Sequence, residues 1–246
     1  MELTLVYTII GFGFAGWSVI GNDSIQTLGT FIASKEKWFK WYTLAAAASG
    51  AMALTIVYGW WTYGGDISYG RLTRIPYQEI QWYHAVAPGI LLLLTRIGIP
   101  VSTTFLVLSA FASTVVLEKM LIKSVVGYGI AAIFAYICWI AISKFINEKF
   151  DEITDKWKIS FWRNAVWVTS AFLWATWLMH DVANIAVYLP RQLNISTLII
   201  VIIYFTILLF YIFYIHGGPI QKVVLDKTGT RYARSATIIN IIYALV

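Results

Sequence analysis

The chain has 246 residues, of which 59% are hydrophobic and 12% are charged, and its mean hydropathy is +0.72. A soluble globular domain carries about 25% charged residues, so this composition excludes an ordinary soluble protein. The formal charge is +6, but the basic residues lie mostly between apolar runs, where they suit a lipid surface and do not indicate nucleic-acid binding. We therefore expect a multi-pass protein of the cell (plasma) membrane, in contact with the lipid bilayer and with no nucleic acid.

Long apolar runs separated by charged connectors predict an all-α, polytopic membrane chain, because a helix of about 20 apolar residues crosses a bilayer core. Tryptophans such as Trp60 and Trp61 stand where the runs meet charge, as in an interfacial aromatic belt. A charged connecting loop at 148–159 divides the chain into a first repeat at 1–147 and a second, incomplete repeat at 160–246. The predicted spans are 4–20, 42–63, 82–97, 100–117, 121–146, 160–179, 195–216 and 233–246.

Two short polar motifs interrupt this apolar pattern at corresponding places. Asp23 is followed three residues later by Gln26, and Asp181 is followed three residues later by Asn184. A Gly-Gly-x-Ile string comes after the next apolar span in each half, at 64–67 and 217–220. Such a two-fold repeat is typical of secondary transporters, whose sites lie at the repeat interface on broken helices. We therefore expect two inverted repeats, with re-entrant half-helices near Asp23, Pro100 and Asp181.

The two aspartates are the first candidates for chemistry. A carboxylate inside a membrane costs several kcal/mol unless it is paired, hydrated or bound to an ion, so Asp23 and Asp181 are candidate cation-binding residues. Asn22, Gln26 and Asn184 add amide oxygens beside them, and oxygen ligands suit a hard cation such as sodium. The alternative is that both acids lie at headgroup level and cap the helices that follow.

The segment Gly98-Ile99-Pro100-Val101-Ser102-Thr103-Thr104 is the second candidate. Proline favours the first turn of a helix, so the three hydroxyls would join free backbone N–H groups at a helix N-terminus and bind an anion. The alternative is a proline kink whose hydroxyls bond back to the helix's own carbonyls. The equivalent element of the second half would fall beyond Val246, so we expect the sequence to be truncated.

Together these motifs resemble those of the inorganic phosphate transporter family. The specific strings are Pro-Val-Ser-Thr-Thr at 100–104 and Asp-Val-Ala-Asn at 181–184, preceded by Gly-Asn-Asp at 21–23. The resemblance implies a sodium- or proton-coupled symporter of inorganic phosphate, often homodimeric, with no cofactor beyond the coupling ions. It implies that the ion and substrate site includes Asp23, Gln26, Asp181 and Asn184, and that Ser102, Thr103 and Thr104 help to hold the anion.

Two other functions stay open from the sequence. Gln26 stands where the family usually has asparagine, and His180 stands where it has a small polar residue; because related members move sulfate, a sulfate or other oxyanion permease is one alternative. His180 adjoins Asp181 and either titrates with it or is structural. We expect no enzyme, but an intramembrane aspartyl protease using Asp23 and Asp181 is the alternative from another class.

Overall fold

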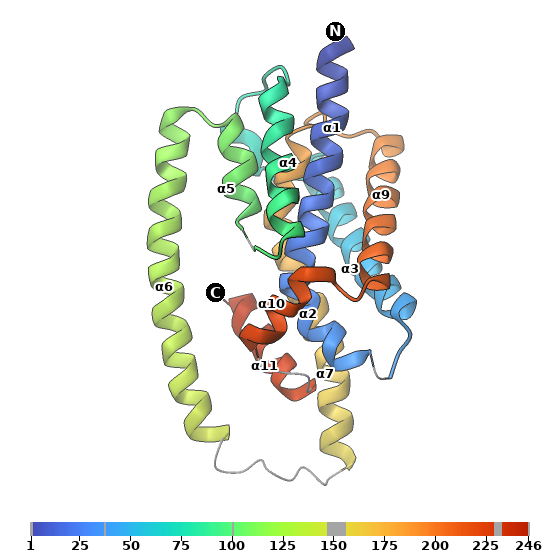
Figure 1. Cartoon of the computed structure of the whole chain (residues 1–246), viewed down its shortest axis with the longest axis vertical. Helices are drawn as coiled ribbons and strands as arrows, with labels where there is room; N and C mark the ends of the chain where they lie inside the picture. The colour runs from blue at the N-terminus through green and yellow to red at the C-terminus, as the bar shows by residue number, and fades with distance from the viewer. Residues whose placement is uncertain (1, 37, 100, 147–155, 229–232, 246) are drawn as a thin grey trace.

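The computed structural model describes residues 2–36, 38–99, 101–146, 156–228 and 233–245, and these residues form helices with no strand among them (Figure 1). The all-α prediction is therefore confirmed for this part of the chain. In order, the elements are α1 (Glu2–Ser18), the π-helical turn η1 (Val19–Asp23), α2 (Ser24–Lys35), α3 (Trp41–Thr62), the 3₁₀ turn η2 (Arg71–Arg74), α4 (Trp82–Arg96), α5 (Thr103–Leu108), the 3₁₀ turn η3 (Ser109–Phe111), α6 (Thr114–Ile146), α7 (Lys156–Asp181), α8 (Ala183–Ala186), α9 (Ile195–Tyr214), α10 (Gly218–Thr228) and α11 (Ala233–Leu245).

Four helical segments among the described residues are long and apolar enough to cross a membrane. They are Leu3–Lys35, Trp41–Thr62, Thr114–Cys138 and Ile195–Tyr214. At a rise of 1.5 Å per residue, about 20 residues span the 30 Å hydrocarbon layer. These helices indicate a multi-pass membrane protein, as the composition predicted.

These segments correspond to four of the eight predicted spans: 4–20, 42–63, 121–146 and 195–216. The spans predicted at 82–97, 160–179 and 233–246 are the helices α4, α7 and α11, which do not meet the same length and composition.

Two boundaries also differ from the prediction. The interruption expected after position 20 is a π-helical turn at Val19–Asp23, so α1 and α2 form one continuous helical segment. The half-helix predicted near Asp23 is therefore wrong, because the helical hydrogen bonds continue through the turn. The predicted single span 100–117 is wrong, because a short helix and a 3₁₀ turn end at Phe111 and a new helix begins at Thr114. Pro100 and most of the predicted loop 148–159 lie outside the described residues.

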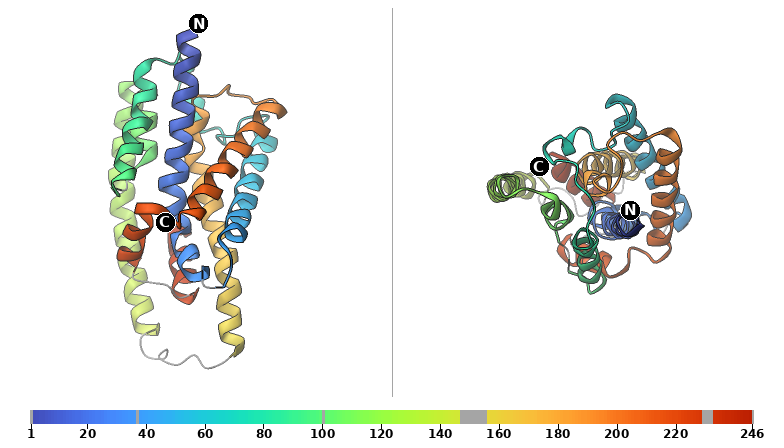
Figure 2. Two further views of the ribbon diagram at one scale, coloured as in Figure 1. Left: turned by 45° about the vertical axis from the view of Figure 1, so that its right-hand side comes forward. Right: turned by 90° about the horizontal axis from the view of Figure 1, so that it is seen from above.

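Helices from the two predicted repeats pack against each other rather than forming separate bodies. α3 packs on α9 and on α7, α2 packs on α7 and α10, and α1 packs on α4 (Figures 1 and 2). α6 stands at one side of the bundle, and none of its apolar window Thr114–Cys138 is buried by the rest of the chain. In a bilayer that surface would face lipid.

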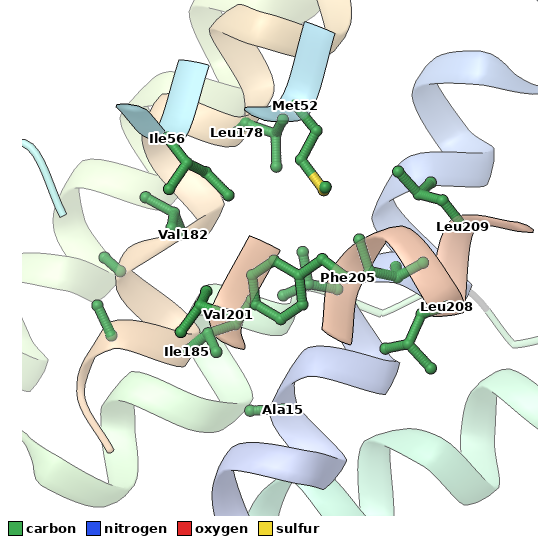
Figure 3. Packing of buried hydrophobic residues seen from close by; sticks show 14 of the residues in the cluster. Ala15, Met52, Ile56, Leu178, Val182, Ile185, Val201, Phe205, Leu208 and Leu209 are labelled. Carbon is green, nitrogen blue, oxygen red and sulfur yellow. The ribbon is translucent and has the colours of Figure 1, made fainter. Parts of the chain in front are cut away.

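A core of buried apolar side chains fixes α1 relative to the end of α7. Phe205 of α9 is fully buried and lies among side chains from α1, α3, α7 and α8 (Figure 3). Leu178, three residues before Asp181, and Val182, directly after it, both belong to this core. The polar side chain between them is therefore held at a defined place by close packing on either side.

Candidate functional site

The π-helical turn η1 places the first polar pair of the site. All five of its residues are buried, and the N–H of Ser24 donates to the carbonyl of Val19, the wider spacing of a π turn. Single π turns inside α-helices are frequent at functional sites, because they turn side chains out of the regular helical register. Here the turn presents Asn22 and Asp23, which are 0% and 3% exposed, to the interior of the bundle.

The second polar pair lies where α7 ends. Asp181 is the last residue of α7 and is 6% exposed, and Asn184 lies in the single turn of α8 and is fully buried. Its amide Nδ2 donates to Asp181 Oδ1 over 3.4 Å. Aspartate and amide, three residues apart, thus face the same space, as their spacing predicted.

The hydroxyl segment reaches the site on a hairpin of two helices. α4 runs toward the middle of the bundle and α5 returns from there (Figure 1). Ser102 caps α5, its hydroxyl accepting from the N–H of Phe105 over 3.3 Å, and its side chain is exposed. Since α5 has only six residues, its dipole is small, and the polar side chains of Thr103 and Thr104 are the main contribution of this segment.

Hydrogen bonds join the hydroxyl segment to both aspartate motifs. Asn22 Nδ2 donates to Asp23 Oδ1 over 2.6 Å and to the carbonyl of Val101 over 2.9 Å, and Thr103 Oγ1, 3.4 Å away, shares one of these two hydrogens. On the other side, Thr104 Oγ1 donates to Asp181 Oδ1 over 3.3 Å. Adjacent threonines therefore connect to opposite halves of the chain.

Two further amide contacts complete the network. Asn184 Nδ2 donates to Thr104 Oγ1 over 3.1 Å, and Gln26 Nε2 donates to Asn22 Oδ1 over 3.1 Å. The structure thus brings Asn22, Asp23, Gln26, Thr103, Thr104, Asp181 and Asn184 into one cluster, hereafter the central polar site. Ser102 lies at its edge with its hydroxyl already used as a cap.

The central polar site has more acceptors than donors. The carboxyl groups of Asp23 and Asp181 are close enough to interact directly. Within the described part of the chain, Asp23 Oδ2, Asp181 Oδ2 and Asn184 Oδ1 are buried and receive no hydrogen bond. A buried acceptor without a donor costs about 1–3 kcal/mol, and two adjacent carboxylates repel each other in addition. Protons, water molecules or bound cations would satisfy these acceptors, and protons or cations would also remove the repulsion.

Two basic residues beside the site were not among the predicted site residues. Arg71 Nη1 lies 2.5 Å from His180 Nδ1, and both side chains are exposed. Desolvation by the surrounding protein lowers the pKa of the Arg71 guanidinium, and the negative charge of Asp181 opposes this shift. His180 was noted as a neighbour of Asp181 in the sequence, but Arg71 lies in a connector of mixed charge that resembles a solvated loop.

Comparison with known proteins adds no assignment. No family model matches the chain, and neither a curated protein nor a solved structure is significantly similar to it. The functional argument therefore rests on the residues of the central polar site and on the helices that carry them.

Proposed function

We propose that this chain belongs to a secondary active transporter that moves inorganic phosphate across the cell membrane together with sodium ions or protons. The observation that carries the proposal is the meeting of Asp23 and Asp181, buried carboxylates from the two halves of the chain, beside two threonine hydroxyls. A sulfate or other oxyanion permease of the same fold would use the same groups.

The cations would bind at the acceptor-rich part of the central polar site. Sodium is held in transporters by carboxylate, amide and backbone oxygens. Within this site, Asp23 Oδ2, Asp181 Oδ2 and Asn184 Oδ1 are buried oxygens that receive no hydrogen bond from the described residues. A cation between the two carboxylates would remove their mutual repulsion and satisfy these acceptors together.

The anion would bind on the hydroxyl side of the same site. Two unneutralised carboxylates would repel phosphate strongly in a medium of low dielectric constant. Binding of the anion therefore requires prior or simultaneous neutralisation of Asp23 and Asp181, which couples the two fluxes. The proposed donors are the hydroxyls of Thr103 and Thr104, the amides of Asn22 and Asn184, and the edge residue Ser102. Those that donate to Asp23 and Asp181 would be released when a cation takes their place at the carboxylates.

The finer architecture belongs to the same proposal. In it, the halves 1–147 and 160–246 are inverted repeats, and the α4–α5 hairpin and the segment around α8 act as re-entrant elements that stop inside the membrane. Alternating access would arise from rocking of the two halves around the central polar site. A homodimer would be the assembled form.

Uptake of radiolabelled phosphate into proteoliposomes tests the proposal. We expect saturable uptake that depends on an inward gradient of sodium or protons and that Asp181→Asn abolishes. Asp226→Asn is the matched control. Asp226 is an exposed carboxylate on α10 and is not one of the residues of the central polar site. Uptake that neither saturates nor responds to either cation gradient would refute coupled transport.

An intramembrane aspartyl protease is the second candidate, because catalysis by such an enzyme also needs two adjacent carboxylates. Aspartic proteases share one proton between their aspartates. Cleavage of a transmembrane peptide by the purified chain in sodium-free buffer, lost in Asp23→Asn and in Asp181→Asn, would favour this function. The crowding of amides and hydroxyls around Asp23 and Asp181 favours transport.

A further inference from the structure

The connector between α3 and α4 is built so that one arginine reaches the central polar site. Asp66 organises its turn: Oδ1 accepts from the N–H of Ser68 over 2.7 Å, and Oδ2 accepts from the N–H of Gly70 over 3.0 Å. Gly70 has φ +72°, a left-handed conformation that glycine adopts without strain. The 3₁₀ turn that starts at Arg71 follows directly.

Long-range hydrogen bonds fix this connector to the rest of the bundle. The N–H of Leu193 donates to the carbonyl of Gly65 over 2.9 Å, and Trp60 Nε1 donates to the carbonyl of Leu193 over 2.7 Å. Arg191 Nη2 donates to the carbonyl of Ile75 over 2.9 Å. The position of the Arg71 backbone is therefore set by contacts that do not involve its own side chain.

The side chain of Arg71 then meets the end of α7. Its Nη1 lies 2.5 Å from Nδ1 of His180, the residue before Asp181, and its charge interacts with that of Asp181. Lys123 of α6 adds a second positive charge that acts on His180. A basic cluster thus lies directly beside a site whose buried part is rich in acceptors.

We propose that Arg71, positioned by His180, binds the transported anion and selects tetrahedral oxyanions of two negative charges. This inference rests on the proposed transport function and deepens it. A guanidinium carries five N–H donors in a planar fork, which binds phosphate or sulfate in a bidentate manner. The contact with His180 uses one end of the fork, and the exposed remainder is free to face the ligand.

The charge of the anion explains why an arginine is needed beside the central polar site. The donors of the central polar site are hydroxyls and amides, which carry no net charge to offset a divalent anion. Arg71 supplies that charge next to Asp181, at the exposed edge where an anion would first meet the site. The cation would then occupy the buried side and the anion the side of Arg71.

Equilibrium binding of radiolabelled phosphate and sulfate to the purified chain in lipid nanodiscs, at saturating sodium, tests the inference. Arg71→Gln should weaken phosphate binding by at least about tenfold, the usual effect of losing a hydrogen bond to a charged group. Arg71→Lys keeps the charge but loses the fork, and should weaken binding about threefold. Separate phosphate and sulfate measurements identify the oxyanion that the site prefers.

Arg191→Gln is the matched control. Arg191 holds the same connector through Ile75, and the contacts of Gly65 and Trp60 with Leu193 remain when Arg191 is replaced, so phosphate affinity should fall far less than in Arg71→Gln. If Arg71 only anchored the connector, both variants would weaken binding alike. If it were only a countercharge for Asp181, Arg71→Gln would shift the sodium concentration for half-saturation and leave the phosphate affinity unchanged. Either result would overturn the inference.

The two proposals fail in different ways. Saturable phosphate binding that survives Arg71→Gln would overturn the role of Arg71 and leave the transport proposal standing. Absence of saturable binding of either anion by the unaltered chain would overturn both. If Arg71→Gln does not fold, Arg71→Lys decides the question, because unchanged affinity in that variant contradicts recognition by the guanidinium fork.

Discussion

The hydroxyl of Thr104 donates to Oδ1 of Asp181 over 3.3 Å, and this contact joins residues 77 positions apart in the chain. The same hydroxyl accepts from Asn184 Nδ2 over 3.1 Å. One threonine on a six-residue helix thereby connects the first half of the chain to both polar residues of the second aspartate motif. Because of this contact, residues of both halves are needed to form the central polar site.

Replacing Thr104 by valine should destabilise the protein and weaken phosphate binding. Valine has the same shape but no hydroxyl, so Asp181 loses a donor and Asn184 loses an acceptor. We expect a loss of about 1–2 kcal/mol in unfolding free energy, since buried hydrogen bonds in membrane proteins contribute about that much at most. Thermal unfolding in detergent measures it.

Thr95→Val is the matched control for Thr104→Val. Thr104 is half-buried and Thr95 is buried, and the Thr95 hydroxyl donates to the carbonyl of Leu91 within its own helix over 2.8 Å. That carbonyl belongs to a helical turn, so the control should change stability by less than about 0.5 kcal/mol. Equal losses of unfolding free energy in the two variants would show that the hydrogen bond between Thr104 and Asp181 contributes no more to stability than a hydrogen bond within a helix.

Neutralising Asp181 should stabilise the protein in the absence of sodium. Asp181→Asn removes the repulsion between two buried carboxylates, so we expect a higher unfolding midpoint in sodium-free buffer, with about 2–4 °C for each kcal/mol gained. In the unaltered chain, added sodium should raise the midpoint because it binds only the folded state. Asp181→Asn should lose that response.

Exposed Asp226 provides the comparison for this experiment. Asp226→Asn should leave both the midpoint and the response to sodium as they are in the unaltered chain. A chain that is stabilised by acidification and not by sodium would assign the coupling to protons. A sodium response that persists in Asp181→Asn would place the cation site elsewhere.

The contact between His180 and Arg71 predicts a positioning role for the imidazole. His180→Ala should weaken phosphate binding about threefold to tenfold, because Arg71 would lose the acceptor that orients its guanidinium. His180→Asn should restore much of the affinity, since the amide oxygen of asparagine lies near the place of Nδ1. Binding isotherms at saturating sodium give the comparison, and equal affinities for the alanine and asparagine variants would contradict the role.

A glycine in α2 provides a test of the packing that supports the site. A Cβ atom at Gly29 would lie 2.8 Å from Oε1 of Gln221 and 2.9 Å from Cγ1 of Val224, both on α10. The carbonyl of Gly29 also accepts from Gln221 Nε2 over 2.9 Å. Gly29→Ala should therefore push α2 away from α10 and lower the unfolding free energy by about 1–3 kcal/mol.

Gly50→Ala is the control for this overpacking. A Cβ at Gly50 of α3 meets nothing within 4 Å. Because alanine favours a helix over glycine by about 0.5–1 kcal/mol, this substitution should be neutral or slightly stabilising. Thermal unfolding of both variants separates the steric effect at Gly29 from a general effect of adding a methyl group. A Gly29→Ala protein as stable as the original would contradict the close approach of α2 and α10.

Much of the local structure could be predicted from the sequence. The charge content and apolar runs predicted helices for a membrane, and four described helices meet the length and composition that a membrane requires. The spacing of Asp23 to Gln26 and of Asp181 to Asn184 indicated polar groups on common faces. These features depend on neighbours within a few turns, so the order of residues along the chain contains them.

The boundaries near the site were harder to predict. The π turn at Val19–Asp23 lies inside an otherwise regular helix, and no glycine or proline rule foresees its extra residue. The end of the helix at Phe111 lies within an apolar run that continues beyond it. Hydropathy measures the preference of a segment for lipid, and it does not predict the residue at which a helix ends and the chain reverses direction.

The sequence alone indicated that the protein lies in a lipid bilayer and that its fold is all-α, and it showed which residue types are available for a site. Only the tertiary structure decided which of these residues meet: Asp23 lies beside Asp181, and Arg71 reaches His180 from a connector that looked like a solvated loop. The physical reason is that such contacts depend on how helices distant in sequence pack around a shared core. Packing is a property of the whole bundle and leaves no pattern in any one segment.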